Sequence, residues 1–397
     1  MRAFLLLTLV VISQAYEIIE GEFFLGLKPE NDANVFGQKL KIDFNLEVKK
    51  VWDIKRTKIL WVLGLEADAI SASKLPEIKY MSYNGWAHAY QDDCESTSHP
   101  GVWGLDRIDQ REALTYTNPT SPLAVYEHGM QTGAGVNAYV TDTGIDITHS
   151  TFGGRAVWGY TADGVIGEDD GNGHGTHVSG TIGGIEYGVA KEVSLIAVKV
   201  LSDSGSGPWS ATLDGLNWIQ QQHQTSGRGS VVNMSLGGTG EQEAIEDLIG
   251  QMFAEDVSFG ISAGNSDNDA CNYTPARTPD AVTVAATDRE DVTATFTNYG
   301  SCVDIHAPGV NILSSVPNEG NDEYSGTSMS APHVVGVMAR YISSFGDGNA
   351  PSAQDVTDWL VSTATVGAIT FLPGHESSPN LLLYGPCPLQ LLGHNVP

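Results

Sequence analysis

The chain has 397 residues, 41% of them hydrophobic, so it is long enough to form more than one domain with a large core. Its 20 basic and 48 acidic residues give a net charge of −28. A protein this acidic repels nucleic acids and anionic membranes, which excludes both as expected partners. The excess carboxylates could bind divalent cations, but solubility of a secreted protein explains most of them better.

The N-terminus has the pattern of a secretory signal. Arg2 precedes an apolar run from Ala3 to Ile12, and small residues at Ser13 and Ala15 indicate cleavage after Ala15. This run is too short to span a bilayer, and no later stretch of the sequence is long and apolar enough to do so. We therefore expect a signal peptide over 1–15 and an extracellular protein.

Residues 16–95 are predicted to form a small separate α+β domain. The segments IEGEFFLGLK, KILWVLGLEA and IKYMSYN have strand patterns, and ISASKLPEI has the pattern of a short helix. The basic cluster between Lys49 and Lys58 is better interpreted as a solvated face than as a nucleic-acid site. The polar stretch from Gln91 to Gly101 predicts a linker or cleavage region.

In residues 96–385, buried-type strands alternate with helices, and residues 386–397 are expected to form a C-terminal tail. The strand segments are GVNAYVTD, SLIAVKVL, SVVNMSLGG, VSFGISAGN and AVTVAAT. Helical spacing is found in GTHVSGTIGG, ATLDGLNWIQQQ, EAIEDLIGQMF and SAPHVVGVMARYISSF. This alternation predicts an α/β domain whose mainly parallel sheet has helices on both faces. Reactive groups in such folds gather at the carboxyl ends of the strands.

Three short segments supply, in chain order, a carboxylic acid, an imidazole and a hydroxyl. They are VTDTGID with Asp142, DGNGHGTHVSG with His174, and SGTSMSAPHV with Ser328. A serine hydroxyl becomes a nucleophile only beside a base, and that base must be held in the right tautomer by a carboxylate. The order Asp, His, Ser is one of the few in which this triad occurs in proteins.

Each of these residues alone has a simpler explanation. Ser328 could cap a helix, and Asp142 could end a strand in a turn. His174 could pair with His177 as a metal site, but no further ligands are evident nearby. The glycines around His174 could form a phosphate loop, but neither GxGxxG nor a P-loop lysine is present. The three segments together favour a catalytic triad.

Asn265 in the segment SAGN is a fourth candidate. An amide at a strand end could donate a hydrogen bond to the oxyanion of a tetrahedral intermediate, together with the backbone N–H of Ser328. Alone, this asparagine would be interpreted as a turn residue.

These motifs resemble the subtilisin-like serine proteases, specifically the proteinase K and aqualysin branch. The resemblance runs from Trp103 to Tyr384 and includes TDTGI, GNGHGTHVSG, NMSLGG, SAGN, FTNYGSCVDIHAPG and SGTSMSAPHV in family order. It implies a three-layer subtilisin-like fold, hydrolysis of peptide bonds by acyl transfer, and a ferredoxin-like inhibitory propeptide over 16–95. Such a propeptide templates folding, occupies the cleft and is removed by self-cleavage, here expected between Ala89 and Ser98.

The resemblance also implies residues that bind substrate and calcium. An extended peptide would lie between two backbone segments, Gly205-Ser206-Gly207 and Ser235-Leu236-Gly237. Ser262, Ala263 and Gly264 would form a wall of the S1 pocket, and Trp209 would lie at the rim of S4. The uncharged lining suggests aliphatic or aromatic P1 residues. Two structural calcium sites are implied, one by Asp304 with the carbonyls of Pro279 and Ala281, the other by Asp106, Asp109 and Gln110.

Four cysteines fit an oxidising compartment and allow three pairings. We favour Cys271–Cys302, which the resemblance supports, and less firmly Cys94–Cys387. Cys94 lies so near the expected maturation point that it could be discarded with the propeptide.

Two other functions compete with that of a secreted, monomeric endopeptidase. A catalytically silent relative that binds its own propeptide is disfavoured by the intact catalytic residues. An esterase of the α/β-hydrolase type is disfavoured because GxSxG is absent and the triad order differs.

Overall fold

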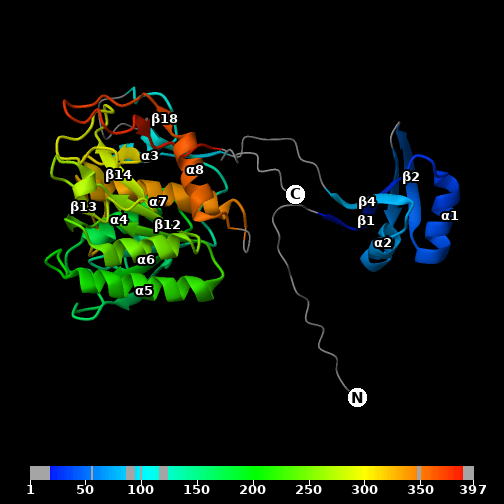
Figure 1. Cartoon of the computed structure of the whole chain (residues 1–397), viewed down its shortest axis with the longest axis horizontal. Helices are drawn as coiled ribbons and strands as arrows, with labels where there is room; N and C mark the ends of the chain where they lie inside the picture. Colours follow the sequence, from blue (N-terminus) through cyan, green and yellow to red (C-terminus); the bar gives the residue numbers. More distant parts are fainter. Residues whose placement is uncertain are drawn as a thin grey trace, which may run out of the picture. The chain divides into compact units, whose positions relative to one another are not determined.

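A computed structural model describes residues 18–54, 57–85, 94–98, 101–115, 124–346 and 350–387 (Figure 1). The chain divides into two compact units, Met1–Gln91 and Asp92–Pro397. The predicted signal peptide lies outside the described residues. Within the described ranges, no helix has the length and apolar character needed to cross a membrane.

The N-terminal unit is a four-stranded antiparallel sheet with two helices, in the strand order β2-β3-β1-β4. Its elements are β1 (Ile18–Leu27), α1 (Ala33–Phe44), β2 (Glu47–Ile54), β3 (Thr57–Leu63), α2 (Glu66–Ser73) and β4 (Ile78–Gly85). This βαββαβ connectivity is the ferredoxin-like arrangement. Sheet side chains such as Leu25 and Leu60 share one core cluster with helix side chains such as Leu40 of α1 and Ala69 of α2. The predicted α+β fold of this region is confirmed.

Two elements of this unit were missed from the sequence, α1 and β2. Asp32 caps α1 by accepting hydrogen bonds from the backbone N–H groups of Asn34 and Val35. Two residues of the basic cluster, Lys49 and Lys50, are exposed on β2, which is an edge strand, whereas Lys58 lies on β3 and Lys55 and Arg56 lie outside the described residues. Charged residues on edge strands prevent pairing with other chains, and they also hide the strand pattern in the sequence.

The second unit is built on a nine-stranded sheet with the order β18-β19-β15-β14-β12-β10-β7-β9-β8. Every neighbouring pair is parallel except β18 and β19. The strands are β7 (Asn137–Asp142), β8 (Ala156–Thr161), β9 (Ser194–Lys199), β10 (Ser230–Met234), β12 (Val257–Ser262), β14 (Val282–Thr287), β15 (Ile305–Pro308), β18 (Thr365–Val366) and β19 (Leu381–Leu382).

Helices cover both faces of this sheet. The helices α4 (His174–Gly183) and α7 (Thr327–Ser343) share one core cluster, whereas α5 (Trp209–Ser226) and α6 (Glu243–Phe253) share another. Successive strand residues alternate between the two clusters: Val231 packs with α4 and α7, and Val232 with α5 and α6. In Figure 1, α5 and α6 lie side by side in green. The predicted three-layer α/β fold is confirmed.

Smaller elements complete the unit. The helices α3 (Trp103–Ile108) and α8 (Ala353–Thr363) flank the sheet, and three two-stranded sheets lie outside it. These pair β5 (Glu95–Ser98) with β6 (Val125–His128), β11 (Gly238–Thr239) with β13 (Tyr273–Thr274), and β16 (Ile312–Val316) with β17 (Gly320–Tyr324). The fold places the three triad candidates at element ends, because β7 ends at Asp142, α4 begins at His174, and α7 begins at Thr327, one residue before Ser328.

Candidate active site

The structure brings Asp142 and His174 into direct contact. Nδ1 of His174 lies 2.8 Å and 2.9 Å from the two carboxylate oxygens of Asp142, which is fully buried. The Asp142 carboxylate also accepts a hydrogen bond of 2.7 Å from the backbone N–H of Thr143. With Nδ1 bound to this carboxylate, the second ring nitrogen, Nε2, is the one left to act as a base.

Close backbone packing holds the imidazole at this place. Gly173 precedes α4 with a φ of 98°, which a larger residue adopts only under strain. A Cβ on Gly175 would lie 2.0 Å from the carbonyl oxygen of Gly144, so only glycine fits there. These glycines let the first turn of α4 lie directly against the loop that follows Asp142.

Opposing effects set the protonation of His174. Burial favours the neutral imidazole, but the charge and hydrogen bond of Asp142, helped by Asp170, raise the pKa of His174 above its ordinary value. Neighbouring His177 is different: burial lowers its pKa to about 4, and its Nε2 lies 2.9 Å from the Ile312 carbonyl oxygen. The two histidines are thus engaged separately, and the described residues contain no cluster of three or more metal-ligating side chains.

Ser328 is the second residue of α7, where backbone N–H groups have no acceptor within the helix. Its hydroxyl donates a hydrogen bond of 3.3 Å to the carbonyl oxygen of Ser235. Among the described interactions there is no hydrogen bond between Ser328 and His174, although both line the same cleft. Catalytic hydrogen bonds are often long in the absence of substrate, and rotation about χ1 would redirect the hydroxyl.

The amide of Asn265 has a defined orientation. Its oxygen accepts hydrogen bonds of 2.8 Å and 2.9 Å from the backbone N–H and the hydroxyl of Thr327. Both of these groups are donors here, so the oxygen must face Thr327 and the NH₂ group must point away from it. Since Asn265 lines the cleft beside Ser328, its NH₂ group is available to a negatively charged oxygen in that cleft.

The cleft has a volume of about 480 Å³, and all ten residues predicted to bind substrate line it. None of its described lining residues is Asp, Glu, Lys or Arg. Gly264, with a φ of 105°, illustrates why one wall needs glycine, because a Cβ there would lie 2.3 Å from the Asn298 amide nitrogen. The three backbone segments that line the cleft, 205–207, 235–237 and 262–264, come from the carboxyl ends of β9, β10 and β12.

The residues of the first predicted calcium site fit a cation. Asp304 accepts a hydrogen bond of 2.7 Å from the backbone N–H of Thr283, which follows Ala281 closely in the chain. Burial raises the pKa of Asp304 to about 6, and a nearby cation would relieve the cost of burying its charge. Hard carboxylate and carbonyl oxygens are the ligands that calcium prefers.

At the second predicted calcium site, two of the side chains, Gln110 and Asp106, are hydrogen-bonded to each other. Nε2 of Gln110 donates to the backbone and carboxylate oxygens of Asp106, and Asp109 accepts from the backbone N–H of Glu127. Burial raises the pKa of Asp109 to about 8. The Gln110 amide presents its nitrogen rather than its oxygen to Asp106, so it is not oriented as a cation ligand, and only the carboxylates of Asp106 and Asp109 remain as candidate ligands at this site.

Asp170 is a site residue that the sequence interpretation missed. Its carboxylate accepts hydrogen bonds from Thr143 Oγ1 (2.7 Å), Gly173 N–H (2.8 Å) and both the N–H (2.8 Å) and hydroxyl (2.6 Å) of Thr176. It therefore ties the loop after Asp142 to the start of α4. The available signal was its position, since Asp170 opens the DGNGHGTHVSG segment just before a helix start, where carboxylates commonly cap N–H groups.

The site and fold match known proteins. Residues 133–380 match the model of the subtilase family (Peptidase_S8). The chain is 37% identical to "Alkaline protease 2" of Aspergillus fumigatus over 85% of this chain and 71% of that protein. It is 45% identical to "Alkaline serine exoprotease A" of Vibrio alginolyticus over 71% of this chain and 50% of that protein. A solved "cold adapted subtilisin-like serine proteinase" is 42% identical, with a TM-score of 0.64, over 72% of this chain and 98% of that structure.

We predict that Asp170→Ala lowers kcat for a peptide substrate by about 10²-fold, because misplacement of a catalytic group by about 1 Å costs that much. The neighbouring Asp169 is exposed and provides a matched control, so Asp169→Ala should retain nearly full kcat. Steady-state kinetics of both variants test this. Equal kcat values for the two variants would show that Asp170 does not position the base.

We further predict that kcat/KM rises with pH as His174 loses its proton, with a midpoint above 6.5, the ordinary histidine value, because its folded pKa is raised. Asp142→Asn removes the main cause of the shift, so the midpoint should fall. The value of kcat should also drop by about 10⁴-fold, a magnitude taken from the same change of this carboxylate in other serine proteases. A pH profile of both proteins checks the prediction, and an unchanged midpoint would contradict it.

Proposed function

The chain belongs to the subtilase family and is a subtilisin-like serine protease, and on this premise we propose that it is a secreted endopeptidase made as a self-processing zymogen. The observation that carries the catalytic assignment is the contact between Asp142 and His174 at the rim of an uncharged cleft that also contains Ser328 and Asn265.

In the proposed reaction, Ser328 Oγ attacks the carbonyl carbon of the scissile peptide while His174 Nε2 accepts the hydroxyl proton. The backbone N–H of Ser328 and the NH₂ group of Asn265 donate hydrogen bonds to the oxyanion that forms. His174 then gives its proton to the leaving amine as the C–N bond breaks. Asp142 stabilises the imidazolium during these transfers. Water, activated by His174, hydrolyses the acyl-enzyme.

Substrate would bind as an extended strand between the Gly205–Gly207 and Ser235–Gly237 segments, using backbone hydrogen bonds. Because the described cleft lining has no charged side chain, we expect an apolar or aromatic P1 residue in the pocket walled by Ser262, Ala263 and Gly264. Trp209 would border the S4 position.

Secretion and zymogen processing are supported by the sequence of the N-terminus and by the two disulfides, Cys94–Cys387 and Cys271–Cys302. Disulfides persist in oxidising compartments. We propose that the N-terminal domain, predicted over 16–95, acts as an intramolecular inhibitor of the catalytic region, predicted over 96–385. We propose further that it is removed by a cut within the predicted interval 89–98, and that the mature enzyme is monomeric.

We predict that Ser328→Ala leaves the precursor uncut and unlabelled by a fluorophosphonate probe, because the nucleophile is missing. The wild-type protein should be processed and labelled on Ser328. Gel mobility and mass spectrometry of the purified proteins, with no other protease present, measure both. Normal processing of the pure variant would exclude self-maturation while leaving the labelling result to judge the catalytic role of Ser328.

Calcium would stabilise the catalytic region through Asp304. We predict that a chelator lowers the melting temperature of the wild type by roughly 5–10 °C, the size expected for losing a well-bound ion. Asp304→Ala should have a lower melting temperature and a smaller response to chelator than the wild type, because only the second predicted site, at Asp106 and Asp109, remains. The exposed helix residue Asp247 serves as control, since Asp247→Ala should respond as the wild type does. Absence of a chelator effect in the wild type would remove calcium from the proposal.

A further inference from the structure

The Cys94–Cys387 disulfide joins the two ends of the described part of the second unit, across 293 residues of sequence. Residues following Cys94 form β5, which pairs antiparallel with β6 from Glu95 opposite His128 to Ser98 opposite Val125. Cys94 is therefore built into the second unit, whose first residue is Asp92. The chain segment next to the expected maturation point is thus part of the protease unit from Cys94 onward.

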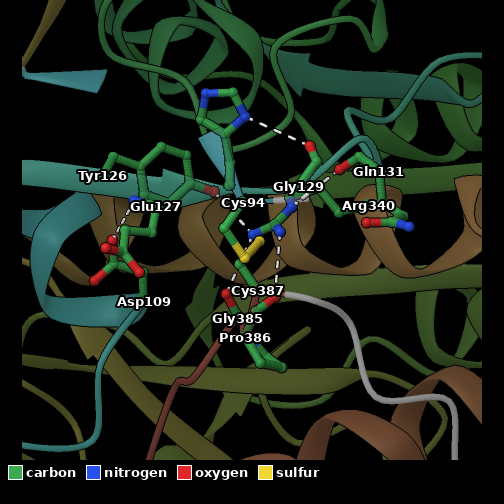
Figure 2. Close-up of a disulfide and its surroundings, with 11 residues drawn as sticks. Cys94, Asp109, Tyr126, Glu127, Gly129, Gln131, Arg340, Gly385, Pro386 and Cys387 are labelled. Carbon is green, nitrogen blue, oxygen red and sulfur yellow. Dashed lines mark hydrogen bonds between the residues drawn. A yellow bond between two sulfur atoms is a disulfide. The ribbon is translucent and has the colours of Figure 1, made fainter. Parts of the chain in front are cut away.

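Arg340 anchors this region to the helix that carries the nucleophile. It is a fully buried residue of α7, the helix whose second residue is Ser328. Its guanidinium donates hydrogen bonds to Tyr126 Oη (3.0 Å), to the carbonyl oxygen of Gln131 (3.1 Å), and to the carbonyl oxygens of Gly385 (3.2 Å) and Pro386 (3.3 Å). Figure 2 shows these bonds converging beside the disulfide.

These contacts fix both partners of the disulfide. Gly385 and Pro386 immediately precede Cys387, and Tyr126 belongs to β6, which pairs with the strand after Cys94. The backbone N–H of Gly385 also donates a hydrogen bond of 2.7 Å to the carbonyl oxygen of Ile108 in α3. We call this assembly of residues 94–98, 125–128 and 385–387 with Arg340 the terminal clasp.

The terminal clasp restricts the position of the cut that can release the N-terminal unit. Hydrolysis of a peptide bond adds one water across that bond and leaves the S–S bond intact. A cut between Cys94 and Ser98, within the interval expected from the sequence, would leave the N-terminal unit covalently attached to the protease through Cys387. An attached inhibitor has a high effective concentration at the enzyme and is not lost by dilution. Only a cut on the N-terminal side of Cys94 frees it.

We propose that the mature enzyme retains Cys94, that processing occurs N-terminal to it, and that the Cys94–Cys387 bond holds the new N-terminus on α7. This rests on the proposed zymogen function, but it concerns where the chain is cut and not which protease cuts it. Retention of Cys94 replaces the alternative that this cysteine leaves with the propeptide.

Mass spectrometry of the purified active enzyme tests the proposal, with a covalent serine-protease inhibitor added at collection to stop autolysis. We expect one polypeptide that begins before Cys94 and that gains four carbamidomethyl groups on reduction and alkylation, with no fragment released. A fragment that separates only after reduction, or a mature chain with three cysteines, would overturn it. Either result is independent of whether Ser328→Ala blocks processing, so the two proposals fail separately.

Hydrogen exchange of disulfide variants tests the role of the bond. In Cys94→Ala/Cys387→Ala, amides of 94–98 and 125–128 should exchange about tenfold faster or more, because this edge of the structure opens more readily. The matched control Cys271→Ala/Cys302→Ala should leave these segments unchanged. Fluorophosphonate labelling rates should stay within about twofold in the first variant. Unchanged exchange at 94–98 would show that the bond does not hold the N-terminus, and if the variant does not fold, the wild-type mass measurement still decides retention.

Discussion

The contact between His174 and the buried carboxylate of Asp142 is the interaction on which the site depends. It fixes the tautomer of the imidazole and offsets the cost of placing a charge in the interior. That contact in turn depends on Asp170, which accepts hydrogen bonds from residues beside both partners. A protein side chain held on both sides in this way needs little rearrangement to reach its reactive geometry, which is the condition for efficient proton transfer.

The parallel sheet explains how distant segments meet. β7 brings Asp142 to the carboxyl edge of the sheet, and α4 and α7 begin at His174 and Thr327. N–H groups in the first turn of a helix have no acceptor within that helix, and in α4 those of His174, Gly175 and Thr176 are bound by side chains of Asn172, Thr143 and Asp170. In the proposed reaction, the start of α7 would serve two purposes, since it positions the Ser328 nucleophile and supplies a donor for the oxyanion. Asn265 would supply the second donor, and its amide orientation is set by Thr327.

The same helix links the active site to the ends of the catalytic region. Ser328 lies near the N-terminus of α7, and the buried Arg340 farther along binds the segments beside the Cys94–Cys387 disulfide. Burial of a guanidinium is costly unless its donors are satisfied, and here four oxygen atoms accept from it. In the proposed zymogen, this arrangement would keep the newly formed N-terminus attached to the second unit after the cut.

The amino-acid sequence by itself determined the α/β class, the order of the main strands and helices and the identity of the triad candidates, because each depends on local periodicity or on short motifs. It missed α1 and β2, whose patterns are weakened by exposed lysines and a short amphipathic face. Only the tertiary structure decided that Asp170 joins the Asp142 and His174 segments, that the Asn265 amide turns its nitrogen to the cleft, and that Cys94 belongs to the second unit. Those features depend on contacts between residues far apart in the chain, and local sequence patterns do not predict such long-range contacts.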